Sequence, residues 1–348
     1  MRLADNDSVI ENTFDIASRL VGTTQTWGGQ NTNLGYAYDT FNRLATMSEP
    51  TGITAYTYDA RAMLASLTDP GGNTFAFSYD ALGRMASQSA PNGITTTPGF
   101  DAASQLTALN HNLGGTTTVA SAAYTLNNTG SRSSELRDHR QAGRLRGRLP
   151  LRQSEGRDER ARASQHDNTR SFGYDFVDRV LSTTNSLLAG KNESFTYDLE
   201  GNWTTNGRQH DDFNQLTEDN DWSYQYDLEG NLRGKTSKAD PTETWDYKWD
   251  ASNRLVKVVH AGNTVAEYAY DPTGRRIAKI TAEGTRRYIL NGANVLLELD
   301  AAGNLLASNT HAGLDNLLAS DEPGNGGPCF IHKDGLNSTI AVTSAGVQ

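Results

Sequence analysis

Aspartate carboxylates are the groups in this sequence that recur most regularly and could do chemistry. Carboxylates serve as general acids and bases, or as calcium ligands, when several of them converge on one site. Here one carboxylate instead follows an aromatic residue about every 21 residues, with gaps, in the pairs Phe14-Asp15, Tyr38-Asp39, Tyr58-Asp59, Tyr79-Asp80, Phe100-Asp101, Tyr174-Asp175, Tyr197-Asp198, Tyr226-Asp227, Trp249-Asp250 and Tyr270-Asp271. This even spacing favours a structural role, in which each carboxylate caps a turn, over catalysis.

The remaining reactive residues form no recognisable catalytic or metal-binding pattern. The seven histidines lack zinc-ligand spacing, and Asp5-Asn6-Asp7 opens like a calcium loop but lacks its glycine and final glutamate. Cys329 is the sole cysteine and has no basic neighbour in the sequence that would activate its thiol. We interpret His332 and Asp334 as part of a turn rather than as a catalytic pair. The sequence predicts no catalytic residue, no metal site, no cofactor and no enzymatic activity.

Three tryptophans are weak candidates for binding sugars. Trp203, Trp222 and Trp245 carry flat apolar faces on which a sugar ring could stack. The favoured interpretation is that they pack against the neighbouring hairpin.

The elements that position these residues are β-hairpins. Between Thr74 and Tyr79 apolar and small polar residues alternate, which is typical of a half-buried strand. Asp80 can then cap a turn, Gly83 can adopt positive φ, and residues 85–89 return as a second strand. The same logic predicts turns at Asp59 to Ala62, Asp80 to Gly83, Asp227 to Gly230 and Asp271 to Gly274, and no helix anywhere.

The hairpins form a repeat. An apolar residue follows most of the aromatic residues six positions later, and such self-similarity indicates an array whose units cannot bury their apolar faces alone. The residues predicted to build the repeat turns are Tyr38, Asp39, Tyr58, Asp59, Tyr79, Asp80, Gly83, Arg84, Tyr197, Asp198, Gly201, Tyr226, Asp227, Gly230, Tyr270, Asp271, Gly274 and Arg275.

Composition agrees with a thin β structure. The 348 residues are 36% hydrophobic with a mean hydropathy of −0.61, which is low for a thick globular core. A net charge of −10 argues against a general nucleic-acid binder. The sequence contains no signal peptide and no apolar run long enough for a membrane helix.

Residues 131–170 break the pattern. They hold 11 arginines and six acidic residues but no Ile, Val, Met or Tyr. Three interpretations are open: an arginine-rich arm for an anionic partner, a polar linker, or repeats replaced through two compensating frameshifts. We expect residues 132–168 to make no regular part of the sheet and to be sensitive to proteases.

The repeat units resemble a known family. Tyr58-Asp59-Ala60-Arg61, Tyr79-Asp80-Ala81-Leu82-Gly83-Arg84 and Tyr270-Asp271-Pro272-Thr273-Gly274-Arg275 resemble the YD repeats of Rhs and teneurin-type proteins, and residues 330–339 resemble the His-x-Asp-x-Leu-Gly-Ser element that closes the repeat region, with Asn337 in place of the family's glycine. The resemblance implies an all-β fold of repeated hairpins forming a spirally wound YD-shell, here partial and open. It also implies a secreted or cell-surface location.

The resemblance divides the chain and suggests its function. Residues 1–130 are expected to be N-terminal YD repeats, 131–170 an irregular linker or frameshifted repeats, 171–315 C-terminal YD repeats, and 316–348 the closing segment. The expected function is that of a non-catalytic shell enclosing a C-terminal toxin that this sequence lacks; the alternative is a carbohydrate- or protein-binding adhesion module of the teneurin type. Open β edges predict that the isolated chain self-associates, with residues 174–307 its more cohesive part.

Overall fold

The protein is an all-β ribbon of antiparallel strands. The computed structural model describes residues 1–4, 8–127, 132–139, 168–186 and 189–344. The first sheet contains β1 (Arg2–Ala4), β2 (Ser8–Phe14), β3 (Leu20–Trp27), β4 (Gln30–Tyr38), β5 (Leu44–Glu49), β6 (Gly52–Tyr58), β7 (Leu64–Thr68), β8 (Thr74–Tyr79), β9 (Met85–Ser89), β10 (Ile94–Phe100), β11 (Leu106–Leu113), β12 (Thr117–Leu126), β13 (Arg132–His139), β14 (Asn168–Tyr174), β15 (Val180–Asn185) and β16 (Glu193–Ser194).

A second sheet continues the ribbon. It contains β17 (Gln209–His210), β18 (Leu216–Glu218), β19 (Trp222–Tyr226), β20 (Leu232–Ser237), β21 (Thr244–Trp249), β22 (Leu255–His260), β23 (Asn263–Tyr270), β24 (Arg276–Thr281), β25 (Gly284–Asn291), β26 (Asn294–Leu299), β27 (Leu305–His311), β28 (Leu317–Asp321), β29 (Cys329–Lys333) and β30 (Thr339–Ser344). Two short 3₁₀ helices, η1 (Ala189–Lys191) and η2 (Thr205–Gly207), accompany the strands, so the expectation of no helix anywhere is wrong for these two turns. Within each sheet, every strand pairs with its neighbours in sequence order, so the prediction of an all-β chain of hairpins is confirmed.

Each repeat hairpin carries a bulge at its turn. In the unit at Asp80, Tyr79 pairs with Met85, and the register shifts between Ser78 and Tyr79. The last residue of the turn adopts left-handed backbone conformation, with φ +79° at Gly83 and +65° at Ala62. Glycine adopts this conformation without a Cβ clash, which explains its frequency at this position.

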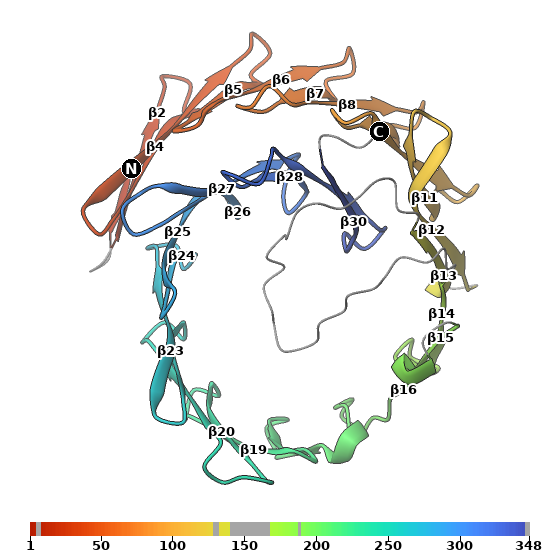
Figure 1. The fold of residues 1–348 in the computed structure, drawn as a ribbon, viewed down its shortest axis with the longest axis vertical. Helices are drawn as coiled ribbons and strands as arrows, with labels where there is room; N and C mark the ends of the chain where they lie inside the picture. The colour runs from red at the N-terminus through yellow and green to blue at the C-terminus, as the bar shows by residue number, and fades with distance from the viewer. Residues whose placement is uncertain (5–7, 128–131, 140–167, 187–188, 345–348) are drawn as a thin grey trace.

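The ribbon winds into a spiral that overlaps itself. It passes once around an open ring, and its C-terminal strands then run inside the N-terminal strands (Figure 1). Met47 and Leu34 pack there with Leu297, and Phe75 packs edge-on against Phe330 with ring centres 5.9 Å apart. The face that bears these side chains in the N-terminal strands therefore points into the spiral.

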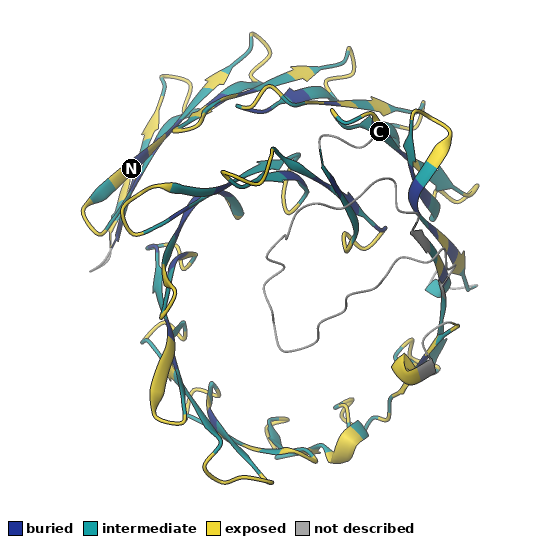
Figure 2. Ribbon diagram, in the orientation of Figure 1, coloured by how far each residue is buried: buried dark blue, intermediate teal, exposed yellow. Residues whose placement is uncertain are grey.

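The buried core lies in this overlap. Between Tyr124 and Val258, no described apolar side chain is fully buried, because the ribbon there is a single layer (Figure 2). The expectation that residues 174–307 form the more cohesive part is therefore wrong. The largest apolar clusters instead join residues 34–75 to residues 289–330, since each layer supplies the cover that the other lacks.

The arginine-rich segment begins inside the sheet. Strand β13 pairs with β12 through residues 132–139 and with β14 through residues 134–137. The expectation that residues 132–168 contribute nothing regular is wrong for these residues. Backbone pairing on both sides and a buried ion pair replace the aromatic packing that the segment lacks. Residues 140–167 lie outside the described part of the chain, and the proposed domain division stays a prediction.

Among the described residues, none of the helices has the length and apolar character needed to span a membrane.

Candidate functional site

The repeated aspartate closes each hairpin through its carboxylate. At Asp39, Oδ1 accepts hydrogen bonds from the backbone N–H groups of Phe41 at 2.8 Å and Arg43 at 2.9 Å. Arg43 Nε donates to Oδ2 at 2.7 Å. The carboxylate therefore accepts hydrogen bonds from two backbone N–H groups of the tight turn and from one guanidinium.

The same arrangement recurs around the ribbon. Arginine fills the fourth position after the aspartate at Asp15, Asp80, Asp175, Asp250 and Asp271. Asparagine replaces it after Asp198 and Asp227, where Asn202 and Asn231 donate to Oδ2 through their side-chain amides. Positive φ occurs at the predicted turn glycines Gly83, Gly201, Gly230 and Gly274.

Consecutive turns are connected through the aromatic residue. The Arg43 guanidinium lies over the Tyr58 ring at 4.6 Å from its centre, and the Tyr58 hydroxyl donates to the Leu44 carbonyl at 2.9 Å. Tyr38, Tyr79, Tyr174, Tyr197, Tyr226 and Tyr270 donate in the same way to the preceding hairpin, and Trp249 uses its indole N–H. The Tyr-Asp-Arg set thus connects each unit to the next.

Hydrogen bonds lower the pKa of the carboxyls of Asp15, Asp39, Asp59 and Asp80 below their usual value of 3.8. At Asp39 the largest cause is the backbone N–H of Arg43, and desolvation opposes it. At Asp80 the side-chain hydrogen bond from Arg84 is the largest cause of the lowered pKa. A carboxyl held in its ionised form by its own turn is suited to capping and poorly suited to proton transfer near neutral pH.

The sequence analysis did not identify several repeat units, because a residue that is not Tyr, Phe or Trp occupies their aromatic position. His210 pairs with Leu216 across the Asp211 turn, and Leu126 pairs with Arg132, both with the six-residue spacing of the other units. That spacing, together with the Asp or Asn that follows, is the signal that could have identified them. The prediction of a turn at Asp334 is confirmed, since Lys333 pairs with Thr339 across it with the same spacing. Asn337 adopts φ +65° in the Asp334 turn, so asparagine serves there in place of glycine.

A further unit, at Asp300, lies on the other edge of the ribbon. Leu299 pairs with Leu305 across the Asp300 turn, but the extra hairpin β25–β26 precedes it. Successive turns of a hairpin ribbon lie alternately at its two edges. The extra hairpin therefore places the Asp300 turn at the edge opposite to that of the other aspartate turns of the repeat units. Accordingly, Gln30 donates to the Ala301 carbonyl at 3.2 Å from a first-layer hairpin of that other edge.

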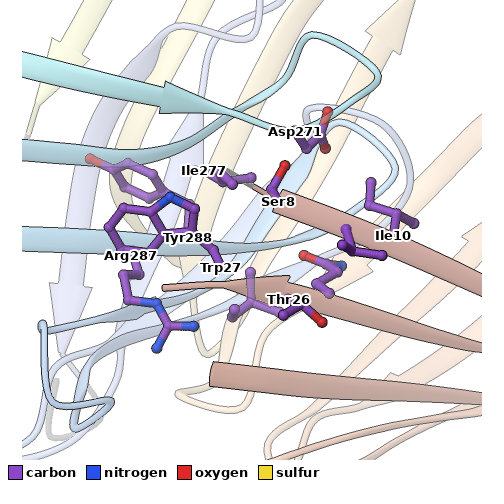
Figure 3. A pocket seen from close by; sticks show the side chains of 11 residues that line it. Ser8, Ile10, Thr26, Trp27, Asp271, Ile277, Arg287 and Tyr288 are labelled. Carbon is purple, nitrogen blue, oxygen red and sulfur yellow. The ribbon is translucent and has the colours of Figure 1, made fainter. Parts of the chain in front are cut away.

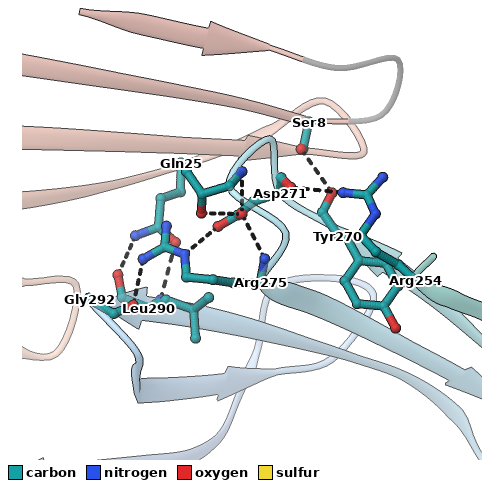
Figure 4. A network of polar contacts seen from close by, with 9 residues as sticks. Ser8, Gln25, Arg254, Tyr270, Asp271, Arg275, Leu290 and Gly292 are labelled. Carbon is teal, nitrogen blue, oxygen red and sulfur yellow. Dashed lines mark hydrogen bonds and ion pairs between the residues drawn. The ribbon is translucent and has the colours of Figure 1, made fainter. Parts of the chain in front are cut away.

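Polar contacts align the two layers where the overlap begins. Gln25 Nε2 donates to the Leu290 carbonyl, and Ser8 Oγ donates to the Tyr270 carbonyl (Figure 4). Arg287 donates to the side chain of Gln30. A small pocket lies beside these contacts and is lined in part by Ile10, Thr26 and Trp27 of the first layer (Figure 3). Its walls lie where the two layers of the ribbon meet, a contact that we call the seam. Asp271, the buried carboxylate at the edge of the pocket, pairs with Arg275.

Polar side chains of the closing segment contact the first layer. The buried His111 and His332 rings meet edge-on with centres 5.1 Å apart, and His332 Nε2 lies 2.8 Å from Thr343 Oγ1. Desolvation, followed by the charge of His111, lowers the pKa of His332 to about 3. Both rings are therefore neutral near pH 7, as partners in a seam and not as a catalytic dyad.

Asp334 is the other buried group of the closing segment. Its Oδ2 lies 2.5 Å from Arg137 Nη2 of β13, and its Oδ1 accepts from the backbone N–H groups of Leu336 and Ser338. The Gly335 N–H donates to the Tyr124 hydroxyl at 2.6 Å. The turn thereby ties the C-terminal strands to β12 and β13.

The three tryptophans lie in the single-layer arc, apart from the seam. Lys235 Nζ sits 4.1 Å from the centre of the Trp222 ring, and His260 stacks on Trp245 with ring centres 4.2 Å apart. Arg208 lies over Trp203 at 3.6 Å. Each tryptophan therefore uses one ring face within its own or an adjacent hairpin.

Within the described ranges, no group of three or more His, Cys, Asp or Glu side chains is placed to hold a metal ion. Burial, with smaller contributions from Glu322 and Asp321, raises the pKa of the Cys329 thiol, which makes it a poor nucleophile. The geometry of the described residues thus serves turn formation and layer contact.

Comparison with known families identifies the repeat. The RHS repeat model matches residues 38–74 and 58–95, and the Teneurin YD-shell model matches residues 157–292. The chain is a YD-repeat protein. Its repeat architecture is that of a structural shell module.

Two curated proteins share sequence with this YD-repeat chain. The tRNA3(Ser)-specific nuclease WapA of Bacillus spizizenii is 30% identical over 160 residues, which is 45% of this chain and 6% of that protein. The double-stranded DNA deaminase toxin A of Burkholderia cenocepacia is 30% identical over 151 residues, which is 38% of this chain and 10% of that protein. The matched regions are thus a small part of each relative's length.

Solved structures resemble the chain more distantly. The crystal structure of TcdB2-TccC3 gives a TM-score of 0.49 with 12% identity, over 99% of this chain and 21% of that one. The Photorhabdus luminescens Tc holotoxin pore gives a TM-score of 0.44 with 12% identity, over 93% of this chain and 20% of that one.

Proposed function

We propose that the chain is a non-catalytic part of a YD-repeat shell that encloses the toxin domain of a secreted polymorphic toxin. The observation that carries the proposal is the self-overlapping spiral, whose second layer lies against the inner face of the first (Figure 1). A wall of this kind surrounds space without needing a catalytic site of its own.

The relatives agree with this role. Two curated proteins that share the repeats are named as a nuclease and a deaminase toxin, and the matches span a small part of each. We infer that the activity of such proteins lies outside the repeats and that the repeats serve as their container. A secreted or cell-surface location follows from the same role.

Protection of an attached domain tests enclosure directly. Strand β30 contacts the inward-facing strands of the first layer, where Asn92 donates to Thr343 Oγ1 at 2.8 Å. A small protease-labile reporter fused after Gln348 would follow this strand, with four residues between them. We expect the reporter to be cleaved more slowly by thermolysin in this fusion than when it is free.

The matched control carries the same reporter before Met1, next to the outer-layer strand β2. That reporter should be cleaved at the rate of the free domain. Equal cleavage of the two fusions would contradict enclosure, provided that the chain itself remains intact on the same gels.

A second candidate function is that of an adhesion module that binds a cell-surface glycan or protein. The observation that favours it is that Trp222 and Trp245 lie in β19 and β21, and Trp203 in the bridge to Tyr197, all within the part of the ribbon that forms a single layer (Figure 1). Glycan-array binding that is lost on Trp245→Ala and kept on Trp27→Ala, a tryptophan of the layer seam, would support this function over enclosure.

A further inference from the structure

Two buried histidines meet where the C-terminal strands lie inside the first layer (Figure 1). His111 belongs to β11 of the first layer and is 2% exposed, and His332 belongs to β29 of the second layer and is 3% exposed. Their rings lie edge-on with centres 5.1 Å apart. Strands β29 and β30 form one hairpin, which we call the closing hairpin. The histidine pair therefore joins the closing hairpin to the first layer.

The hydrogen bonds of the two rings are made without a charge on either. His111 Nε2 lies 2.9 Å from the Lys333 carbonyl, which can only accept, so Nε2 carries the proton of the neutral ring. His111 Nδ1 lies 2.8 Å from the Thr96 hydroxyl, which donates to it. His332 Nε2 is also 2.8 Å from a hydroxyl, that of Thr343. The seam thus accommodates both rings in their neutral form.

The strands around the two rings offer no counter-ion. His111 pairs with Thr96 of β10 and with Ala120 of β12. His332 pairs with Ala341 of β30. Strands β10, β12 and β30 contain no charged residue, and among the described residues no carboxylate is hydrogen-bonded to either ring. A proton added to either ring would therefore remain unbalanced.

The charged groups of the closing hairpin have partners of their own. Lys333 Nζ donates to the Asp315 carbonyl at 3.2 Å. Asp334 pairs with Arg137 and accepts from two backbone N–H groups. The remaining titratable residues of the strands next to the rings are Tyr124, Asp321, Cys329 and, one strand beyond Ala120, His139.

We propose that the pair is a pH switch: protonation of His111 and His332 in acid releases the closing hairpin from the first layer. A proton on either ring places a charge where burial has removed water and where no carboxylate replaces it. Protons on both rings place like charges in direct contact. Release of the closing hairpin returns both rings to water, so protonation and release favour each other. The spiral would then open at its inner end, whatever the wall encloses.

The opening should be confined to the closing hairpin. Elsewhere in the seam, Ile289 and Leu297 of β25 and β26 pack with Leu34 and Met47 of the first layer. Gln25 adds amide hydrogen bonds to β25. None of these side chains gains a proton in mild acid, so this part of the seam should stay closed.

Burial sets the pH at which the switch acts. Desolvation is the largest cause that lowers the pKa of both rings, to about 3 for His332. A ring in water titrates near 6.5, so the released state is favoured roughly 25-fold more at pH 5 than at pH 7 through His332 alone. His111 adds to this factor in the same direction.

Hydrogen–deuterium exchange of the full chain tests the switch. Rates at pH 7 and pH 5 are corrected for the intrinsic pH dependence of amide exchange. Residues 329–344 should exchange through an opening whose equilibrium constant rises at least tenfold from pH 7 to pH 5. Residues 284–299, which form β25 and β26, should show no such rise. A closing hairpin that stays protected at pH 5, or equal rises in the two segments, would overturn the proposal.

Substitution of the histidines separates a switch from a merely structural contact. His332→Gln and His111→Gln keep a neutral side chain that can donate and accept hydrogen bonds, so the closing hairpin should stay protected at pH 7. Each should remove part of the rise at pH 5, and the double variant should remove it entirely. His210→Gln, in β17 of the single-layer arc, is the matched control and should leave the rise unchanged.

A rise that persists in the double variant would assign the acid response to other groups and contradict the switch. Where one substitution already exposes the closing hairpin at pH 7, the pH 5 result of the other single variant decides in the same way.

Discussion

Gln25 pairs with the backbone of Leu290 as one peptide group pairs with another. Its Nε2 donates to the Leu290 carbonyl at 2.5 Å, and the Leu290 N–H donates to its Oε1 at 3.1 Å. The two residues belong to β3 and β25, so a single side chain extends backbone hydrogen bonding from one layer of the spiral to the next. Buried backbone groups need such partners, and here a glutamine supplies them.

Replacing Gln25 by alanine should weaken the seam between layers. The substitution leaves the buried N–H and carbonyl of Leu290 without this partner, and each such group costs about 1–3 kcal/mol. We expect the free energy of unfolding in urea to fall by about 1–3 kcal/mol for each of these two groups. Gln105→Ala, which removes an exposed glutamine at a turn, is the matched control and should change the unfolding free energy little. Equal effects of the two substitutions would contradict a special role for Gln25.

Removing the hydroxyl of a repeat tyrosine should have a small and local effect. Tyr58→Phe deletes the hydrogen bond to the Leu44 carbonyl and keeps the ring under Arg43. A loss of about 0.5–1.5 kcal/mol in unfolding free energy is expected. Phe100 occupies the same position without a hydroxyl, so Phe100→Tyr should be neutral or stabilising. Destabilisation by both changes would show that the hydroxyl does not connect the units.

The sequence predicted the hairpin and its turn because both are local. Asp80, Gly83 and the alternation of Phe75, Phe77 and Tyr79 lie within ten residues of one another, and turn chemistry acts over that distance. Units such as the one at His210 were missed because the aromatic residue was taken as the marker. The pairing register across the six-residue interval marks them more reliably.

The seam could not be predicted in the same way. Gln25 and Leu290, or Arg137 and Asp334, meet only because the spiral closes with a particular curvature, which accumulates from small twists at every strand. No local sequence pattern specifies this accumulated curvature. The same reason explains why residues 132–139 were taken as irregular, since Arg137 finds its buried partner 197 residues away.

Mild acid should loosen the seam at His111 and His332. Burial depresses the pKa of both groups, to about 3 for His332. An unfolded histidine titrates near 6.5, so between about pH 6.5 and pH 3 the unfolded chain binds more protons. Stability is therefore full above about pH 6.5 and declines as pH falls through this window.

The unfolding free energy measured against pH checks this prediction. His332→Gln should reduce the slope between pH 6.5 and pH 4. A slope that is unchanged by His332→Gln would assign the acid sensitivity to other groups.

Trypsin should cut between residues 140 and 167 first. The prediction comes from composition, since this stretch offers no aromatic or aliphatic β-branched residue for packing. Arg132 and Arg137 should be spared, because they lie in β13 and Arg137 pairs with buried Asp334. Mass spectrometry of early fragments decides the matter. Early cleavage at Arg137, or an uncut 140–167 stretch beside cuts elsewhere, would contradict it.

The ion pair of Arg137 and Asp334 should be worth more than any exposed pair of the protein. Asp334→Asn removes one of the two carboxylates that Arg137 contacts and leaves Glu135 at 3.0 Å from its Nε, so a loss of about 1.5–3 kcal/mol, the range for a hydrogen bond to a charged group, is expected. Glu298→Gln breaks the more exposed pair with Arg286 and should cost less than about 1 kcal/mol.

A double-mutant cycle makes the test specific. Arg137→Met with Asp334→Asn should destabilise the chain by less than the two single changes added together, since the contact between the two side chains is lost only once. Additive effects, or an Asp334→Asn cost no larger than that of Glu298→Gln, would show that the contact does not hold the layers. A strong coupling would establish that residues 132–139 belong to the folded shell, whatever the origin of the arginine-rich sequence that follows them.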